Sequence, residues 1–204
     1  MRALITAQFD PASLEHLSRQ LSVRQVGWGV TGIPLSPAEL IRELEDTDIL
    51  VTEIEDCTAE VIEACPKLAF IAVCRNNPVN VDAKAARKRG IPVVYTPGRN
   101  AEAVAEFTLC LMLMLARNLG RALRDISSSQ WTLGPVESYL HYKGCELSGR
   151  RVGIIGLGSI GRRVLALCEA FGMRACVHDP FLAQRPAQAP GVSFADLPIL
   201  LRWA

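Results

Sequence analysis

The chain has 204 residues, of which 50% are hydrophobic and 21% are charged. This composition is typical of a globular protein and excludes a disordered or fibrous chain. There are 22 lysine and arginine residues against 21 aspartate and glutamate residues, which leaves a net charge of +1. A chain so close to neutral creates no global field that would attract nucleic acid or anionic lipid, and we therefore expect neither partner.

The sequence favours a reducing compartment and no membrane. Its 7 cysteines are odd in number and scattered, without a C-x-x-C pair, which argues against a disulfide framework or a structural zinc site. The N-terminus lacks the long apolar core of a signal peptide. The most apolar run, residues 107–116, is shorter than the ~20 residues that a membrane helix needs. We therefore expect a cytoplasmic protein that holds no metal.

The first half of the chain alternates short apolar runs with helical patterns. Strands are predicted at 3–6, 48–51, 69–73 and 91–95, and helices at 11–21, after Ser36, from Thr58 to Pro66 and at 81–89. Asp10 and Ser36 each precede a proline, as an N-cap residue does before a proline at the first helical position. Glu39 would complete a capping box with Ser36. Strict alternation of strands and helices predicts βαβ units and a parallel sheet.

Turn residues interrupt this alternation at 96–100, which is the predicted hinge between two domains. Asn100 is expected to cap a long helix that runs to about Arg117. From 121 to 149 the chain is polar and irregular. We expect this segment to pack on another surface or subunit.

A glycine motif follows the predicted strand at 151–155. It reads Gly156-Leu157-Gly158-Ser159-Ile160-Gly161, which is G-x-G-x-x-G. Apolar residues at 160, 164, 167, 168 and 171 predict a helix, closed by Gly172. A second strand at 175–178 is followed by Asp179, 18 residues after Gly161, which is close to the spacing of about 20 residues in dinucleotide-binding proteins.

Each part of this motif has a mechanical reason. Gly156 permits the tight turn out of the strand, Gly158 leaves no Cβ between the backbone and a pyrophosphate, and Gly161 lets the helix lie close to the sheet. Backbone N–H groups near Ser159 and Ile160 would point at the phosphates from a helix N-terminus, where the helix dipole favours an anion.

The acid at the end of the second strand indicates which cofactor is bound. Asp179 would accept hydrogen bonds from the adenosine ribose hydroxyls, and its charge would repel a 2′-phosphate, so NAD is favoured over NADP. Arg162 is either a side-chain contact to the pyrophosphate or a solvated helix residue. A structural βαβ crossover with accidental glycines, and binding of FAD or S-adenosylmethionine by the same architecture, remain as alternatives.

Four further segments of the chain each resemble a segment of one enzyme family. They are 66–68 leading into 71–73, 80–82 followed by 89–93, 96–100 with 104–106, and 146–150 running into the glycine motif. In this order they resemble the D-isomer-specific 2-hydroxyacid dehydrogenases, which include phosphoglycerate dehydrogenase and the glyoxylate/hydroxypyruvate reductases. The resemblance implies an α/β protein: a flavodoxin-like substrate domain, residues 1–99, hinged to a partial Rossmann domain with a doubly wound parallel sheet, residues 100–204. The substrate would bind in the cleft between them.

The resemblance also implies a substrate loop. Backbone amides after the strand at 69–73 would hold the substrate carboxylate, and Asn76 and Asn77 match the binding positions. The family commonly has glycine in place of Asn77, but asparagine tolerates positive φ better than most residues. Arg75 either reaches an anionic group of the substrate or is an ordinary surface arginine. Val104 is expected to contact the cofactor.

The resemblance implies hydride transfer between NAD(H) and a small D-2-hydroxy acid or 2-keto acid. The family's catalytic arginine, glutamate and histidine lie well downstream of the ribose-binding acid, and none of these positions falls within the 204 residues. We therefore expect part of a longer protein, with no catalytic residue in this chain. The alternative is a non-catalytic NAD-binding interaction module, like the family's transcriptional co-repressor. Residues 101–145 match a region that pairs across a two-fold axis, so a homodimer is expected.

Overall fold

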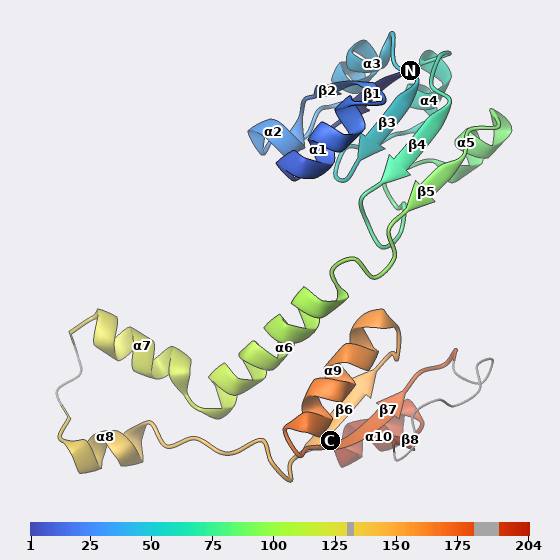
Figure 1. Cartoon of the computed structure of the whole chain (residues 1–204). Coiled ribbons are helices and arrows are strands. Elements are labelled where there is room, and N and C mark those ends of the chain that lie inside the picture. Colours follow the sequence, from blue (N-terminus) through green and yellow to red (C-terminus); the bar gives the residue numbers. More distant parts are fainter. Residues whose placement is uncertain (130–132, 182–191) are drawn as a thin grey trace. The chain divides into compact units, whose positions relative to one another are not determined.

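The computed structural model describes residues 1–129, 133–181 and 192–204 (Figure 1). The chain divides into two compact units, Met1–Arg99 and Asn100–Ala204. Each unit is built on a parallel sheet with helices. The α/β fold class predicted from the sequence is therefore confirmed.

The first unit holds a five-stranded sheet in the order β2-β1-β3-β4-β5, with every neighbouring pair parallel. This is the flavodoxin-like strand order. Its elements are β1 (Arg2–Ile5), α1 (Pro11–Ser18), β2 (Ser22–Gln25), α2 (Trp28–Thr31), α3 (Pro37–Leu44), β3 (Ile49–Thr52), α4 (Ala59–Ala64), β4 (Phe70–Val73), α5 (Ala83–Lys88) and β5 (Val93–Tyr95).

The residues predicted to cap the first turns of α1 and α3 do so. The Asp10 side chain accepts a hydrogen bond from the Ser13 amide at 3.0 Å and caps α1. Ser36 and Glu39 form the capping box at the start of α3. In contrast, the helix predicted over 11–21 was too long, and β2 and α2 were not predicted. The strand β2 was missed because it is a polar edge strand with alternating exposed and half-buried residues, so it carries no apolar run.

Alternate residues of the strands face opposite sides of the sheet. Leu4, Leu50 and Ile71 pack with the buried side chains of α3, α4 and α5 on one face. Ile5 and Val51 pack on the other face with side chains of α1. This second face keeps an apolar hollow of about 320 Å³ beside α1, over β3, β4 and β5.

The second unit holds a three-stranded parallel sheet in the order β6-β7-β8. Its elements are α6 (Ala101–Ala116), α7 (Leu119–Ser127), α8 (Pro135–His141), β6 (Arg151–Ile155), α9 (Ser159–Ala170), β7 (Arg174–His178), β8 (Ser193–Phe194) and α10 (Leu197–Trp203). Leu165 of α9 packs with Ile154 and Val177 of the sheet, and α6 packs on α9 around Cys168. The buried Leu200 of α10 lies against β6 at Gly153.

Three local predictions in this unit were wrong. Asn100 makes no side-chain hydrogen bond at the start of α6. The segment 121–149 is not irregular throughout, because it contains most of α7 and all of α8. Phe171, predicted to lie on the apolar face, is the C-cap residue of α9 and is 41% exposed, whereas Leu165, outside the predicted face, is buried. The buried side of α9 is thus rotated slightly from the predicted one. The sequence places leucine and valine on neighbouring sides of this helix, so the apolar residues alone do not decide which of these sides is buried.

No single helix in the described ranges has both the length and the hydropathy of a membrane-spanning helix. The helices α6 and α7 reach these limits only as a pair, across a bend of 73°.

Candidate functional site

The turn between β6 and α9 carries the glycine motif. Gly156 has φ of +89°, in the left-handed region that favours glycine. Its amide donates to the carbonyl oxygen of His178 on β7 at 2.7 Å. The turn therefore leaves the sheet at the carboxyl ends of its strands, which is where ligands bind in open parallel sheets.

The other two glycines of the motif meet different surroundings. A Cβ at Gly161 would overlap the carbonyl oxygen of Gly156, so the close approach of α9 to the turn requires glycine here. A Cβ at Gly158 would meet nothing within 4 Å. Gly161 therefore serves the packing of the fold, while the open space at Gly158 is of the kind that a bound pyrophosphate fills.

The N-terminus of α9 provides hydrogen-bond donors beside this open space. Gly158 occupies the N-cap position, without a side-chain cap. In the described part of the chain, the N–H groups of Ser159 and Ile160 have no hydrogen-bond partner. Unpaired N–H groups at the positive end of a helix of 12 residues are suited to an anion.

Asp179 joins the end of β7 to the glycine turn. Its Oδ2 accepts a hydrogen bond from the Leu157 amide at 2.8 Å, and its Oδ1 accepts one from the Phe181 amide at 2.8 Å. The sequence placed Asp179 near the motif by spacing alone, and it gave no indication of the bond to Leu157. The glycines, the unpaired amides and the Asp179 carboxylate lie at one edge of the sheet. This arrangement could hold a dinucleotide.

The remaining residues predicted to bind a cofactor lie on the helices of this unit. Arg162 is exposed, and no ion pair engages it among the described residues. Its neighbour Arg163 pairs with Glu102 at 2.7 Å, which links α9 to α6. Val104 is half-buried on α6, and its carbonyl accepts a hydrogen bond from the Thr108 hydroxyl. In the described ranges, no hydrogen bond joins Val104 to the glycine turn.

The predicted substrate loop lies at the carboxyl end of β4 in the first unit. Within the described residues, the backbone N–H groups of Arg75, Asn76 and Asn77 have no hydrogen-bond partner. Asn76 and Asn77 are exposed and Arg75 is half-buried. Three successive unpaired amides at a strand end are hydrogen-bond donors that could bind a carboxylate.

The segment after β5 holds one side of this loop. The Thr96 amide donates to the carbonyl oxygen of Arg75 at 3.0 Å, and the Gly98 amide donates to Oδ1 of Asn76 at 2.9 Å. Arg99 pairs with Glu53 at the end of β3. The side chain of Asn76 is thus engaged within the loop framework, and its backbone amide is the group that can face a ligand.

Cys74 precedes this loop but is unsuited to act as a nucleophile. Burial raises the pKa of its thiol, an effect that Arg99 opposes. At neutral pH the group therefore stays a thiol, and the thiol is far less nucleophilic than the thiolate.

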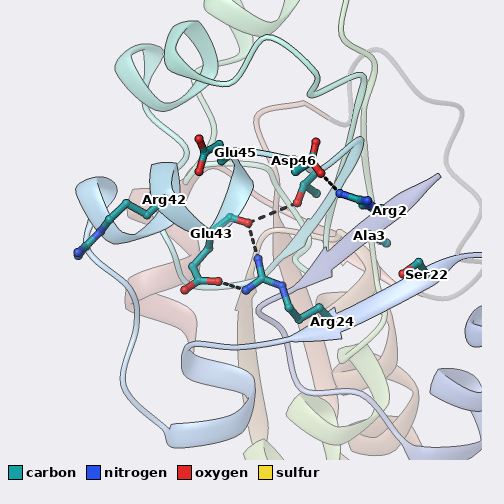
Figure 2. A pocket seen from close by; sticks show the side chains of 9 residues that line it. Arg2, Ala3, Ser22, Arg24, Arg42, Glu43, Glu45 and Asp46 are labelled. Carbon is teal, nitrogen blue, oxygen red and sulfur yellow. Dashed lines mark hydrogen bonds and ion pairs between the residues drawn. The ribbon is translucent and has the colours of Figure 1, made fainter.

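A hollow of about 310 Å³ lies at the opposite, amino-terminal edge of the same sheet (Figure 2). Its charges largely pair with one another: Arg24 with Glu43, and Arg2 with Asp46. Exposed pairs of this kind contribute little to stability, and the hollow offers few unpaired charges to a ligand. We assign it to the surface of the fold.

Residues 3–195 match the sequence profile of the D-isomer specific 2-hydroxyacid dehydrogenase catalytic domain. The chain belongs to this family. The Bacillus subtilis protein YoaD, named as a 2-hydroxyacid dehydrogenase, is 37% identical over 185 residues, covering 89% of this chain and 54% of YoaD. A D-3-phosphoglycerate dehydrogenase of Methanocaldococcus jannaschii is 34% identical, covering 85% of this chain and 32% of that protein.

Solved structures of the family share the fold. A crystal structure from Polaromonas, titled as a D-isomer specific 2-hydroxyacid dehydrogenase, NAD-binding, superposes with a TM-score of 0.86 at 28% identity. It covers 100% of this chain and 62% of the Polaromonas chain. The chain spans about half the length of YoaD and about a third of the M. jannaschii protein.

Proposed function

We propose that this chain supplies the cofactor cradle and part of the substrate site of an oxidoreductase that transfers a hydride between NAD(H) and a small D-2-hydroxy acid or 2-keto acid. The observation that carries the proposal is the position of Asp179, at the tip of β7 and bonded to the Leu157 amide of the glycine turn. In dinucleotide-binding folds a carboxylate at this position meets the adenosine ribose, and in this proposal the pyrophosphate would lie on the N-terminus of α9.

The cofactor in this proposal is NAD. The carboxylate of Asp179 would accept hydrogen bonds from ribose hydroxyls, whereas a 2′-phosphate would bring like charges together. The Polaromonas protein, which is described as NAD-binding, supports this choice. The bound nicotinamide would supply the hydride. The unpaired amides of Arg75, Asn76 and Asn77 would hold the substrate carboxylate, and we assign the proton donor to none of the described residues.

Turnover against a panel of 2-keto acids tests the proposal. The complete protein that the gene encodes is mixed with NADH and with glyoxylate, pyruvate, hydroxypyruvate or 3-phosphohydroxypyruvate, and the loss of NADH absorbance is followed. We expect at least one of these acids to be reduced. NADH binding without turnover of any acid would contradict the enzymatic proposal and would favour a non-catalytic NAD-binding interaction module.

Removing the carboxylate at position 179 is expected to weaken NADH binding. Asp179→Ala deletes a charged acceptor, which corresponds to about 1.5–3 kcal/mol, or roughly a 10- to 100-fold rise in Kd. Discrimination against NADPH is expected to fall as well, because the like-charge repulsion is lost. Titration calorimetry with both cofactors measures these changes.

A second acid of the same unit provides the control. Asp196 is exposed and makes no side-chain hydrogen bond at the start of α10. Asp196→Ala should therefore leave both affinities at the wild-type value. Equal NADH affinity in the Asp179 and Asp196 variants would remove Asp179 from the cofactor site.

We further propose that the complete protein is a homodimer that pairs through α6 and α7. Phe107, Leu111 and Leu115 recur on one side of α6 and are exposed, and α7 continues the apolar surface with Leu119, Leu123 and Ile126. The opposite side of α6 packs on α9. An exposed apolar surface of this extent is a common mark of a protein–protein interface.

Leu115→Glu is expected to weaken this dimer. Leu115 is 81% exposed in the single chain, so a charge there costs the fold little but would be buried in the interface. Loss of a buried leucine corresponds to roughly 1.5–3 kcal/mol, which is about a 10- to 100-fold rise in the dimer Kd. Sedimentation equilibrium measures it, with Ile33→Glu, at another exposed apolar position, as the control. A wild-type monomer, or a dimer unchanged by Leu115→Glu, contradicts the proposed interface.

A further inference from the structure

Two polar side chains are buried beside the substrate loop without being part of it. Glu55 lies in the segment that follows β3, and 1% of its surface is exposed. Asn80 lies just beyond the substrate loop and is 7% exposed. Burying a carboxylate and an amide is costly unless their hydrogen bonds are made inside the protein, so their contacts indicate what they hold in place.

Asn80 ties the end of the substrate loop to the segment after β3. Its Nδ2 donates to the carbonyl oxygen of Glu55 at 2.8 Å. Its own carbonyl oxygen accepts the Cys57 amide at 2.7 Å, and the Asp82 amide returns to the carbonyl oxygen of Cys57 at 2.9 Å. Oδ1 of Asn80 is buried without a partner among the described residues. The side chain therefore acts as a bridge between two backbone segments.

Glu55 anchors the other end of this bridge. Its Oε1 accepts the Trp28 amide at the start of α2 at 2.9 Å, and its Oε2 lies 3.4 Å from the Thr52 hydroxyl. These contacts fasten the segment after β3 to the segment after β2. Together with Asn80, they link the carboxyl ends of three strands, β2, β3 and β4.

The substrate loop is thus held from two sides. On one side, Thr96 and Gly98 bind Arg75 and Asn76. On the other side, the chain turns through the bond from the Val79 amide to the Asn77 carbonyl at 2.9 Å and then reaches the Asn80 bridge. These attachments use the carbonyl oxygens of Arg75 and Asn77 and the side chain of Asn76, and they leave the three backbone amides without a partner among the described residues. The direction in which these amides point depends on the hydrogen bonds on both sides of the loop.

We propose that Asn80 is a positioning residue for the substrate carboxylate, acting through the amides of Asn76 and Asn77, with Glu55 as its anchor. This inference rests on the proposed function. Fixing the loop before the substrate arrives removes the ordering cost from binding, and it keeps the donors aligned with the carboxylate. Asn80 touches neither substrate nor cofactor in this proposal, so its effect falls on the keto acid alone.

Asn80→Ala, made in the complete protein, separates positioning from general stability when it is compared with Asp82→Ala. Asp82 lies two residues further along the chain, and its Oδ1 caps α5 by accepting the amides of Lys84 and Ala85. Both variants lose hydrogen bonds and are expected to lower the melting temperature. Only Asn80→Ala is expected to raise the KM of the keto acid, by about 10-fold, while the KM of NADH stays unchanged.

Hydrogen exchange at the Val79 amide supplies a readout that does not need turnover. Asn80→Ala is expected to lower its protection, and Asp82→Ala is not. Equal effects of the two variants on KM and on Val79 exchange would overturn the inference. If the wild-type protein reduced no keto acid, the proposed function would fail. Unchanged hydrogen exchange at the Val79 amide in Asn80→Ala would overturn the positioning role, whether or not a keto acid is reduced.

Discussion

Replacing Gly158 by alanine is expected to weaken NADH binding by at least about 100-fold while the protein stays folded. Gly158 has φ of −75°, which alanine adopts without strain, and an added Cβ would meet nothing within 4 Å. The free energy of unfolding should therefore change by less than about 1 kcal/mol. A bound pyrophosphate would need the same space, so the added methyl group would separate it from the amides at the start of α9.

Calorimetric titration measures the NADH affinity of each variant, and a thermal melt measures its stability. Gly120→Ala is the matched control, because its Cβ also meets nothing and Gly120 lies on α7, away from the glycine turn. It is expected to leave NADH affinity unchanged. Wild-type affinity in Gly158→Ala would mean that no pyrophosphate lies against this turn.

Gly161→Ala is expected to damage the fold and the cofactor site together. Its Cβ would overlap the carbonyl oxygen of Gly156, which is backbone and cannot rotate away as a side chain would. The helix α9 would have to move off the turn, at a cost of about 3 kcal/mol in the free energy of unfolding. For a unit of this size the melting temperature should fall by about 10 °C or more.

Denaturant titration with a spectroscopic probe of the second unit measures the loss at Gly161. NADH affinity is expected to fall as well, since the unpaired amides of α9 move with the helix. A Gly161→Ala protein as stable as Gly158→Ala would contradict the close packing of α9 against the turn.

Much of the fold follows from local sequence. The N-caps at Asp10 and Ser36 act within a few residues, so a short pattern is enough to predict them. The glycine motif is also local, since a tight turn and a close helix depend on missing side chains. β2 was missed because an edge strand need not be apolar, and the cap at Asn100 failed because a capping residue type does not guarantee a cap.

The site was predictable only where its groups are neighbours in sequence. The spacing between the glycines and Asp179 predicted their proximity, but not the bond from the Leu157 amide. The bridge from Asn80 to Glu55 spans distant parts of the chain, so no periodic pattern could reveal it. Asn76 was placed at the loop correctly, while its side-chain bond to Gly98 depends on tertiary structure.

Transfer of deuterium from NADH in which both hydrogens at C4 of the nicotinamide are replaced by deuterium tests the central claim most directly. The complete protein is incubated with the labelled cofactor and with pyruvate, hydroxypyruvate or 3-phosphohydroxypyruvate, whichever the panel shows to be reduced, because these acids give a product that is chiral at C2. The product is examined by mass spectrometry and chiral chromatography. The account predicts a D-2-hydroxy acid that carries the deuterium at C2. An L-hydroxy acid, or a product without deuterium at C2, would contradict it.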